Sequence, residues 1–206
     1  MFSMGESSDM AMQAISIKCP NCGAGVSANQ ERCEWCRSPV CITSFNSMSD
    51  LSPLQLNKYA SAYRKELANE PDNREINTSI AFCYLKLKMY DEAYNCFSKA
   101  IVDNFDNSET YFYAAVSLLK GKKAFLHTRA EIDKILELIN AALMIESRGI
   151  YYYFMAYIKH DYFKRKFLIT KPDYKECLMS AQGAGCSNAD ISHFYSVAGV
   201  EPVNMV

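Results

Sequence analysis

The stretch from residue 73 to residue 107 constrains the fold more than any other, because it carries two helical periodicities separated by a short break. In each half, small and bulky apolar residues recur at the spacing that places them on one helix face. These residues are Ile80, Ala81 and Tyr84 in the first half, and Ala93, Phe97 and Ala100 in the second. The alanines let two antiparallel helices approach closely, and the aromatic rings fill the space between them. The stretch therefore predicts a helical hairpin with its turn at residues 88–91.

This hairpin resembles a tetratricopeptide (TPR) repeat, a helix-turn-helix unit of about 34 residues. When Arg74 takes the first repeat position, the six residues above fall on packing positions of the family. Pro71 falls in the turn between repeats, and Asn77 stands where the family has an aromatic residue. The resemblance implies an array of such hairpins. It implies no particular function, because the fold is a scaffold whose function depends on its grooves.

Four cysteines near the N-terminus form two Cys-x-x-Cys pairs. Cys19 and Cys22 form the first pair, and Cys33 and Cys36 form the second after a spacer of ten residues. Two residues between cysteines allow a tight turn that aims both thiolates at one metal ion, and Gly23 lets the backbone reverse directly after the first pair. The pattern predicts one structural Zn²⁺ with four sulfur ligands. A rubredoxin-like iron site is the alternative, although its spacer is usually much longer.

The segment around these cysteines resembles the short zinc ribbons found at the N-termini of bacterial proteins, of the form Cys-Pro-x-Cys-Gly…Cys-x-x-Cys. It departs from that form at Arg37, where a second glycine is usual. A domain of about thirty residues cannot bury enough apolar surface to fold alone, so the metal would supply its stability. Four cysteine ligands leave no open coordination position, which argues against a catalytic metal.

The chain divides into a flexible tail at 1–15, a zinc ribbon at 16–45, a linker at 46–52 and a TPR-like helical domain at 53–206. The alternating, β-branched residues from Val40 to Phe45 predict a closing strand of the ribbon. The expected fold class is therefore mainly α: a TPR-like helical-hairpin array, or α-solenoid, with a small N-terminal β zinc ribbon.

Further helices follow from capping residues and apolar periodicity. Ser52 and Pro53 predict the start of a leading helix, and Ser108 is a plausible cap for the helix that follows the central hairpin. The remaining helices are expected at 130–145, 150–167, 172–181 and 188–198.

Composition excludes several classes of protein. With 22 Lys and Arg against 23 Asp and Glu, the chain gives no global indication of nucleic-acid or membrane binding. No apolar run approaches the roughly 18–20 residues of a spanning helix, and the first residues lack the basic region of a secretory signal. We therefore expect a cytoplasmic protein with no membrane partner, whose nine cysteines serve one metal site and apolar packing rather than disulfides.

The TPR resemblance also implies which residues line the groove of the array. They are Phe82, Leu85 and Lys86 in one repeat and Phe112, Val116 and Leu119 in the next. They do not match the family's carboxylate clamp for peptide C-termini, but they suit an amphipathic helix or an extended apolar peptide. The alternative is that the leading helix or the ribbon covers this surface within the molecule.

Two other surface features allow two interpretations each. Trp35 lies at a knuckle tip, where we expect it to pack on the ribbon's own sheet; the alternative is an exposed anchor for a partner. Residues 159–167, with Lys120, Lys122 and Lys123, mix cations with aromatic rings, as single-stranded nucleic-acid sites do. A solvated helix face is the favoured interpretation, because the chain is nearly neutral.

The sequence favours a binding protein over an enzyme. Its three histidines stand far apart, and no phosphate-binding loop, carboxylate pair or nucleophile motif is recognisable. The leading hypothesis is a cytoplasmic adaptor or scaffold that holds a protein partner in the groove. The alternatives are a nucleic-acid-binding accessory factor and a regulatory subunit of an enzyme or defence complex.

Overall fold

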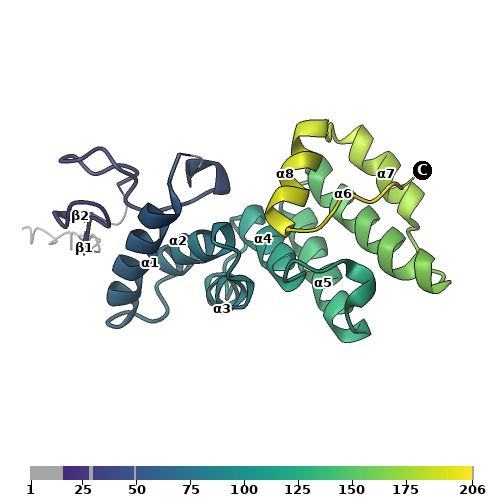
Figure 1. Ribbon diagram of the computed structural model, residues 1–206, viewed down its shortest axis with the longest axis horizontal. Helices are drawn as coiled ribbons and strands as arrows, with labels where there is room; N and C mark the ends of the chain where they lie inside the picture. Colours follow the sequence, from purple (N-terminus) through teal and green to yellow (C-terminus); the bar gives the residue numbers. More distant parts are fainter. Residues whose placement is uncertain (1–15, 28–29, 49, 206) are drawn as a thin grey trace, which may run out of the picture.

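The computed structural model describes residues 16–27, 30–48 and 50–205. The expected N-terminal tail, 1–15, lies outside the described residues. The rest confirms the expected fold class, with a small cysteine-bearing β hairpin followed by eight α-helices that pack in sequence (Figure 1).

The hairpin consists of β1 (Ser16–Lys18) and β2 (Gly25–Ser27), which pair antiparallel with Ile17 opposite Val26. The helices are α1 (Pro53–Leu67), α2 (Arg74–Lys86), α3 (Tyr90–Ala100), α4 (Ser108–Leu118), α5 (Arg129–Ile145), α6 (Gly149–Ile158), α7 (Tyr174–Gly183) and α8 (Asn188–Ala198). All but the last pack against their neighbours along the chain, which produces the array of antiparallel helices.

Side-chain caps begin most of these helices. Ser52 caps α1, as the sequence predicted, and it forms a capping box with Gln55. Similar boxes begin α5, α7 and α8. The expected cap of α4 is wrong by one residue, because Asn107 accepts the hydrogen bond from the Thr110 N–H. Ser108 instead donates to Glu146 from a buried position.

The central hairpin forms as its apolar periodicity predicts. Its small residues are fully buried between α2 and α3, where the rings of Phe82 and Phe97 meet edge to face at 5.2 Å. Asn77 compensates for the missing aromatic residue in a different way. Its side-chain amide donates hydrogen bonds to the carbonyls of Pro71 and Asn73, which ties the turn before α2 to the helix.

The helix expected at 150–167 changes its geometry after Ile158. It continues as a π-helical turn at Lys159–Phe163 and a short 3-10 turn at Lys164–Lys166. The π turn is buried because the segment Ala124–Leu126 packs on it, and the Asp161 carboxylate accepts a hydrogen bond from the Phe125 N–H at 3.0 Å. Lys159 and His160 are therefore not part of a solvated helix face.

The last helix returns across the array and packs against α6 and α4. Phe194 of α8 lies against Phe154 at 4.8 Å and Phe112 at 6.5 Å, and the hydroxyls of Tyr195 and Tyr153 are 3.2 Å apart. Figure 1 shows α8 on the upper side of α4, and α3 and α5 on the lower side. The helix therefore covers part of the face on which the sequence placed the groove.

Candidate metal centre and the filled groove

The four predicted metal ligands lie together at the tips of two turns. The sulfurs of Cys19 and Cys36 are 3.6 Å apart, those of Cys22 and Cys33 are 3.7 Å apart, and all four lie within 4.8 Å of one another. A metal–sulfur bond of about 2.3 Å in a tetrahedral site places its sulfurs about 3.8 Å apart. The cluster therefore fits one metal ion with four sulfur ligands.

The two turns have the same backbone design. In each, the residue after the second cysteine donates its N–H to the carbonyl of the first, Gly23 to Cys19 and Arg37 to Cys33. Both residues have left-handed φ angles, +78° for Gly23 and +60° for Arg37. The departure from the ribbon pattern thus places an arginine where a side chain strains the backbone.

Replacing Arg37 with glycine should strengthen metal binding. Relief of the left-handed strain is worth about 1 kcal/mol, or about fivefold in affinity. Competition with a chromophoric chelator measures this. Gly23→Ala should have the opposite effect and weaken metal binding. An added Cβ there contacts no neighbouring atom, so the left-handed backbone is the only source of strain. Gly25→Ala is the neutral control, with free space and an ordinary φ angle. Unchanged or weaker binding by Arg37→Gly would show that this strain is not limiting.

The surroundings of the sulfurs shift their acidity in opposite directions. Hydrogen bonds from Ser38 lower the pKa of Cys36 to about 6, whereas burial raises the pKa of Cys19 to about 12. A metal ion binds thiolates and displaces their protons. Protons therefore compete with the metal for these sulfurs, and metal affinity decreases as the pH falls.

The segment from Val40 to Phe45 does not form the expected strand. One isolated bridge joins Arg32 to Pro39, and the chain then leaves the ribbon. The alternating pattern arises because Val40 and Ile42 are completely buried against the helices while Thr43 is exposed. Alternating apolar and polar residues indicate an extended chain that is buried on one side. Here the buried side packs on helices rather than on a sheet.

Residues 39–48, which we call the inserted segment, lie on α1 and α2 through hydrogen bonds from helix side chains. The hydroxyls of Tyr59 and Tyr63 donate to the carbonyls of Pro39 and Val40, at 3.2 and 2.8 Å. Ser79 accepts from the Ile42 N–H at 2.8 Å, and Lys86 donates to the Met48 carbonyl. The helices thus bind the backbone of an extended chain.

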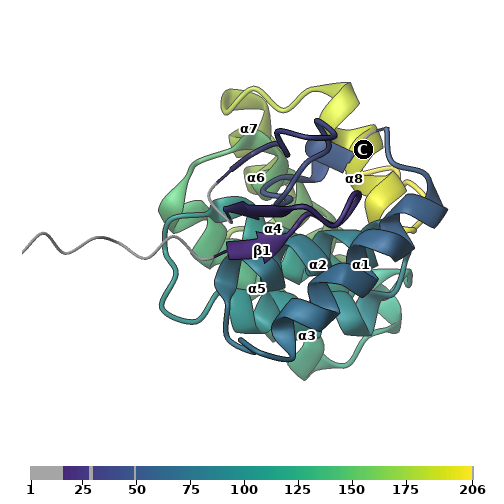
Figure 2. The same cartoon turned by 90° about the vertical axis from the view of Figure 1, so that its left-hand side faces the viewer.

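The inserted segment ends in a 3-10 turn at Phe45–Met48, which lies on the same side of the array as α8 (Figure 2). Met48 is fully buried. The Phe45 ring stacks on Tyr113 at 5.3 Å and meets Phe82 and His193 edge-on at 6.4 and 5.0 Å. The turn therefore connects the inserted segment to α8 across the array.

The residues predicted to line an open groove are consequently inside the molecule. Phe82, Leu85, Phe112, Val116 and Leu119 are at most 3% exposed. Of the two interpretations of this surface, the open groove is wrong and coverage within the molecule is observed, although the covering elements are the inserted segment and α8 rather than the leading helix. Lys86 lies at its edge and is half-buried.

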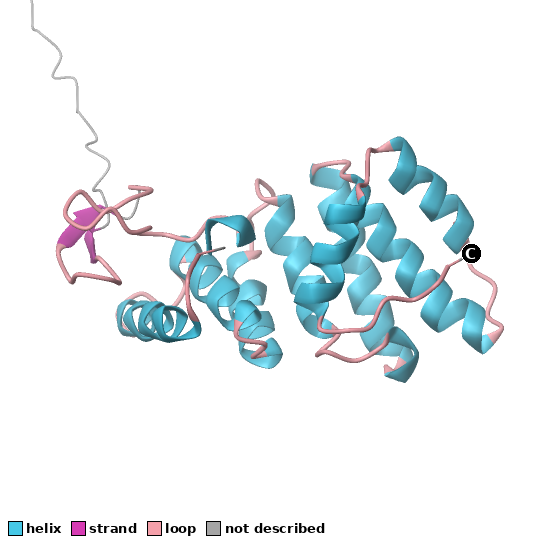
Figure 3. Ribbon diagram, turned by 45° about the horizontal axis from the view of Figure 1, so that its top comes forward, coloured by secondary structure: helices cyan, strands magenta, loops and turns pink. Residues whose placement is uncertain are grey.

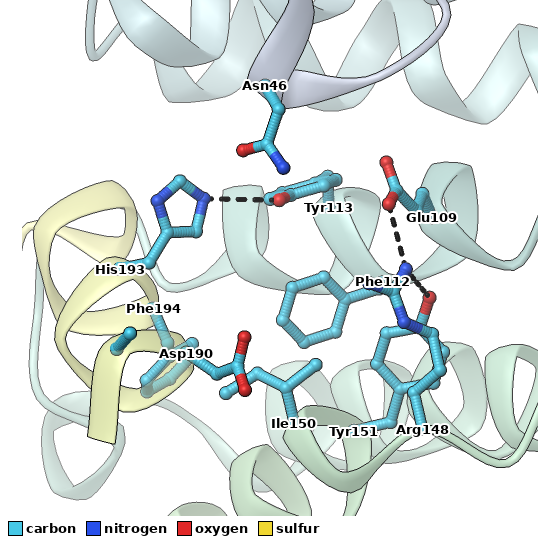
Figure 4. Close-up of a pocket in the computed structure, with 11 residues that line it drawn as sticks. Asn46, Glu109, Phe112, Tyr113, Arg148, Ile150, Tyr151, Asp190, His193 and Phe194 are labelled. Carbon is cyan, nitrogen blue, oxygen red and sulfur yellow. Dashed lines mark hydrogen bonds and ion pairs between the residues drawn. The ribbon is translucent and has the colours of Figure 1, made fainter. Parts of the chain in front are cut away.

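A pocket of about 240 Å³ remains where the two coverings meet (Figure 4). Its floor is aromatic, with Phe112, Tyr113 and Tyr151. Polar side chains form its rim: Asn46 from the inserted segment, Glu109 from α4, Arg148 before α6, and Asp190 and His193 from α8. We call this the junction pocket.

The rim is already organised by hydrogen bonds. Arg148 donates to Glu109 at 2.8 Å and to the Tyr151 hydroxyl at 3.3 Å, and the Tyr113 hydroxyl lies 3.3 Å from Nε2 of His193. Burial lowers the pKa of His193, against the opposing effect of Asp190 and Glu109. The imidazole is therefore neutral at neutral pH, and the pocket presents one cation and two carboxylates.

Sequence reasoning did not find the junction pocket. Glu109 belongs to the first turn of a helix predicted to line the groove, but Arg148 and His193 are distant in sequence and carry no motif. Their proximity depends on the return of α8. No local pattern in the sequence indicates that α8 returns across the array.

Trp35 lies next to the metal ligands and is 77% exposed. The expected packing on the ribbon's own sheet is therefore not observed, and the ring is accessible at the knuckle tip. Of the basic residues considered for nucleic acid, Lys120 pairs with Asp91 and Lys123 pairs with Glu201. Lys159 is buried, so the basic residues of the nucleic-acid alternative do not form one continuous surface.

The fold and the cysteine cluster define the class of this protein as a helical-hairpin array with an N-terminal four-cysteine hairpin. Comparison of the sequence with models of known protein families and with curated proteins gives no match. Among the described residues, no helix is long and apolar enough to cross a membrane.

Proposed function

We propose that this chain is a non-enzymatic protein-interaction adaptor built from TPR-like hairpins and an N-terminal structural zinc ribbon. Zn²⁺ is the metal that four thiolates in tetrahedral array select most commonly. The other five cysteines form no disulfide among the described residues, which suits a reducing compartment such as the cytoplasm.

One observation carries this proposal: the helices already hold an extended chain. The inserted segment receives backbone hydrogen bonds from Tyr59, Tyr63 and Lys86 and buries the side chains of Val40, Ile42 and Met48. Main-chain hydrogen bonds that supply affinity, with pockets for alternate side chains, are the features of extended-peptide recognition. The array thus has the chemistry of a peptide-binding surface, and its own chain occupies the first half.

The junction pocket is where a partner peptide would add to this surface. At about 240 Å³ it is smaller than the roughly 300–1,000 Å³ of small-molecule sites, which favours a single inserted side chain over a cofactor. The floor of Phe112 and Tyr113 suits an apolar side chain, and the rim of Asn46, Glu109 and Arg148 suits the polar backbone beside it. Trp35 provides a second exposed anchor near the zinc ribbon.

The hydrogen bonds of the polar side chains at the rim of the junction pocket support binding of a partner rather than catalysis. Arg148 is engaged by Glu109, and His193 by Tyr113. These interactions organise the rim without pairing a nucleophile with a base. The partner in this proposal is a peptide or the end of a helix with an apolar side chain.

Blocking the mouth of the junction pocket tests the proposal. Asn46→Trp places a large ring at the rim from an exposed position, whereas Ser47→Trp places the same ring next to it, also exposed but away from the pocket. We expect wild type and Ser47→Trp to select the same peptides from a random phage-displayed library, and Asn46→Trp to lose them.

Two outcomes would contradict this assignment. If Asn46→Trp selects the same peptides, the partner binds elsewhere on the surface. If the chain selects no peptide but retains single-stranded RNA or DNA, with an affinity that falls steeply with salt, it is a nucleic-acid-binding accessory factor.

A further inference from the structure

The connection between α6 and α7 exposes three consecutive apolar side chains. Phe167 is 95% exposed, Leu168 43% and Ile169 97%. We call these three residues the apolar loop. A soluble surface rarely presents adjacent large apolar groups in this way unless they meet a partner.

Hydrogen bonds at the base hold the apolar loop in place. Phe167 has a left-handed φ of +56° and donates its N–H to Lys164, and the Leu168 N–H donates to the Phe163 carbonyl at 2.9 Å. On the other side, the Lys159 ammonium donates to the Thr170 hydroxyl at 2.6 Å. Exposure of the three side chains therefore follows from a defined backbone.

Cations surround the apolar loop. Lys164, Arg165 and Lys166 precede it, and Lys171 and Lys175 follow it. Aromatic rings support the first group: Lys166 lies 3.9 Å from the Tyr162 ring centroid, Arg165 4.3 Å from Phe125 and Lys164 4.5 Å from Tyr174. Such contacts hold the stems of the side chains against the protein while their charged ends remain near the surface.

The acidic residues of this region are used within the fold. Asp161 is fully buried and pairs with Arg165, whereas Asp173 and Glu176 form the capping box of α7. Glu176 also lies 3.4 Å from the ammonium of Lys171, whose side chain is 81% exposed. Between residues 159 and 176 there are six Lys and Arg against three Asp and Glu, in a chain whose net charge is −1. The surroundings of the apolar loop are therefore positively charged on a nearly neutral molecule.

The apolar loop also lies where a flat surface can reach it. Figures 1 and 3 place the connection between α6 and α7 at the end of the long axis opposite the β hairpin. A planar partner can approach this end without contact with the junction pocket or the metal site.

The composition of the whole chain predicted no membrane partner, but this local cluster has the opposite character. We propose that the apolar loop and its surrounding cations dock this protein peripherally on an anionic lipid bilayer. Phe167 and Ile169 would enter the boundary between headgroups and acyl chains, and Lys164, Lys166 and Lys171 would lie among anionic headgroups. The charge complementarity favours a lipid surface over a second copy of this chain, since two copies would oppose like charges at the same loop.

Sedimentation with vesicles tests this docking on the chain of 206 residues. We expect binding to vesicles that contain phosphatidylserine in phosphatidylcholine, and much weaker binding to phosphatidylcholine alone. Neutralising Lys166 or Lys171 to glutamine should lower partitioning about fivefold each. The double variant Phe167→Ser/Ile169→Ser should lower it at least tenfold.

The double variant Leu54→Ser/Phe105→Ser is the matched control, since it removes two exposed apolar side chains from distant positions. It should bind as wild type does, and thermal unfolding should show that both double variants are folded. Absence of binding to anionic vesicles, or equal loss in both double variants, would overturn the proposal. A concentration-dependent dimer that only Phe167→Ser/Ile169→Ser abolishes would overturn it in favour of a second copy.

Discussion

Replacing Phe82 with alanine should lower the free energy of unfolding by about 3–5 kcal/mol. The ring is fully buried and lies at the junction of three parts of the fold. It contacts Phe97 within the central hairpin at 5.2 Å, Tyr113 of the next helix at 5.4 Å and Phe45 of the inserted segment at 6.4 Å. Its removal therefore leaves a cavity that no single element can close by a small shift.

Urea denaturation followed by circular dichroism measures this effect. Phe105→Ala is the matched control, because that ring is 71% exposed and its loss should change stability by less than about 0.5 kcal/mol. If Phe82→Ala is as stable as the control, the ring does not pack as described, and the groove predicted from the sequence is open in solution.

Removing the metal should unfold the four-cysteine hairpin and leave the helices folded. Structural Zn²⁺ contributes apparent free energies of about 10–16 kcal/mol in small zinc domains, so a chelator should abolish the fixed structure around β1 and β2. Cys33→Ser should have the same effect, because Cys33 is fully buried and supplies one of the four sulfurs. The helical signal should fall little, since α2 to α8 pack on one another.

The emission of Trp35, the only tryptophan in the chain, reports on the ribbon, and elemental analysis counts and identifies the metal. Cys96→Ser is the control, a half-buried helix cysteine that should retain one equivalent of zinc. Iron with the absorption of a thiolate complex would replace the zinc assignment by the rubredoxin-like alternative. Acidification should release the metal, because protons compete for the sulfurs.

The two predictions distinguish two contributions to the stability of the chain, apolar packing and metal ligation. Phe82 acts through apolar packing that is independent of metal and pH, whereas Cys33 acts through ligation that depends on both. The inserted segment joins the two parts, since Val40 and Ile42 leave the ribbon and enter the helical core. Loss of metal should therefore loosen one end of this segment and leave Phe45 and Met48 in place.

Local patterns in the sequence predicted the position of every α-helix of the array, although the helix expected at 150–167 continues as a π-helical turn after Ile158. Ser52 with Pro53, and the periodic positions around Ala81 and Ala93, act through contacts of short range along the chain. The metal cluster follows for the same reason, because two residues between cysteines aim both sulfurs at one point. These features require no knowledge of distant segments.

The candidate sites could not be predicted so well, because they depend on contacts between distant segments. The alternation from Val40 to Phe45 predicts a strand, yet the backbone of this segment accepts from and donates to the side chains of Tyr63 and Ser79. Burial alone sets the alternation, whatever surface supplies it. The sequence did not indicate the apolar loop for a related reason. Its residues resemble the end of a buried helix, and only the left-handed backbone at Phe167 directs the chain away from the helices.

By itself, the sequence determined the mainly α class, the positions of the helices along the chain and the grouping of Cys19, Cys22, Cys33 and Cys36, since each depends on spacing along the chain. Only the tertiary structure decided what covers Phe82 and Phe112 and what stays exposed at Phe167. The physical reason is that several apolar segments of the chain could cover the same aromatic surface, and the path of the whole chain decides which of them reaches it. An arrangement with the inserted segment and α8 over this surface is more stable than an open groove, because these two elements bury aromatic surface that would otherwise face water.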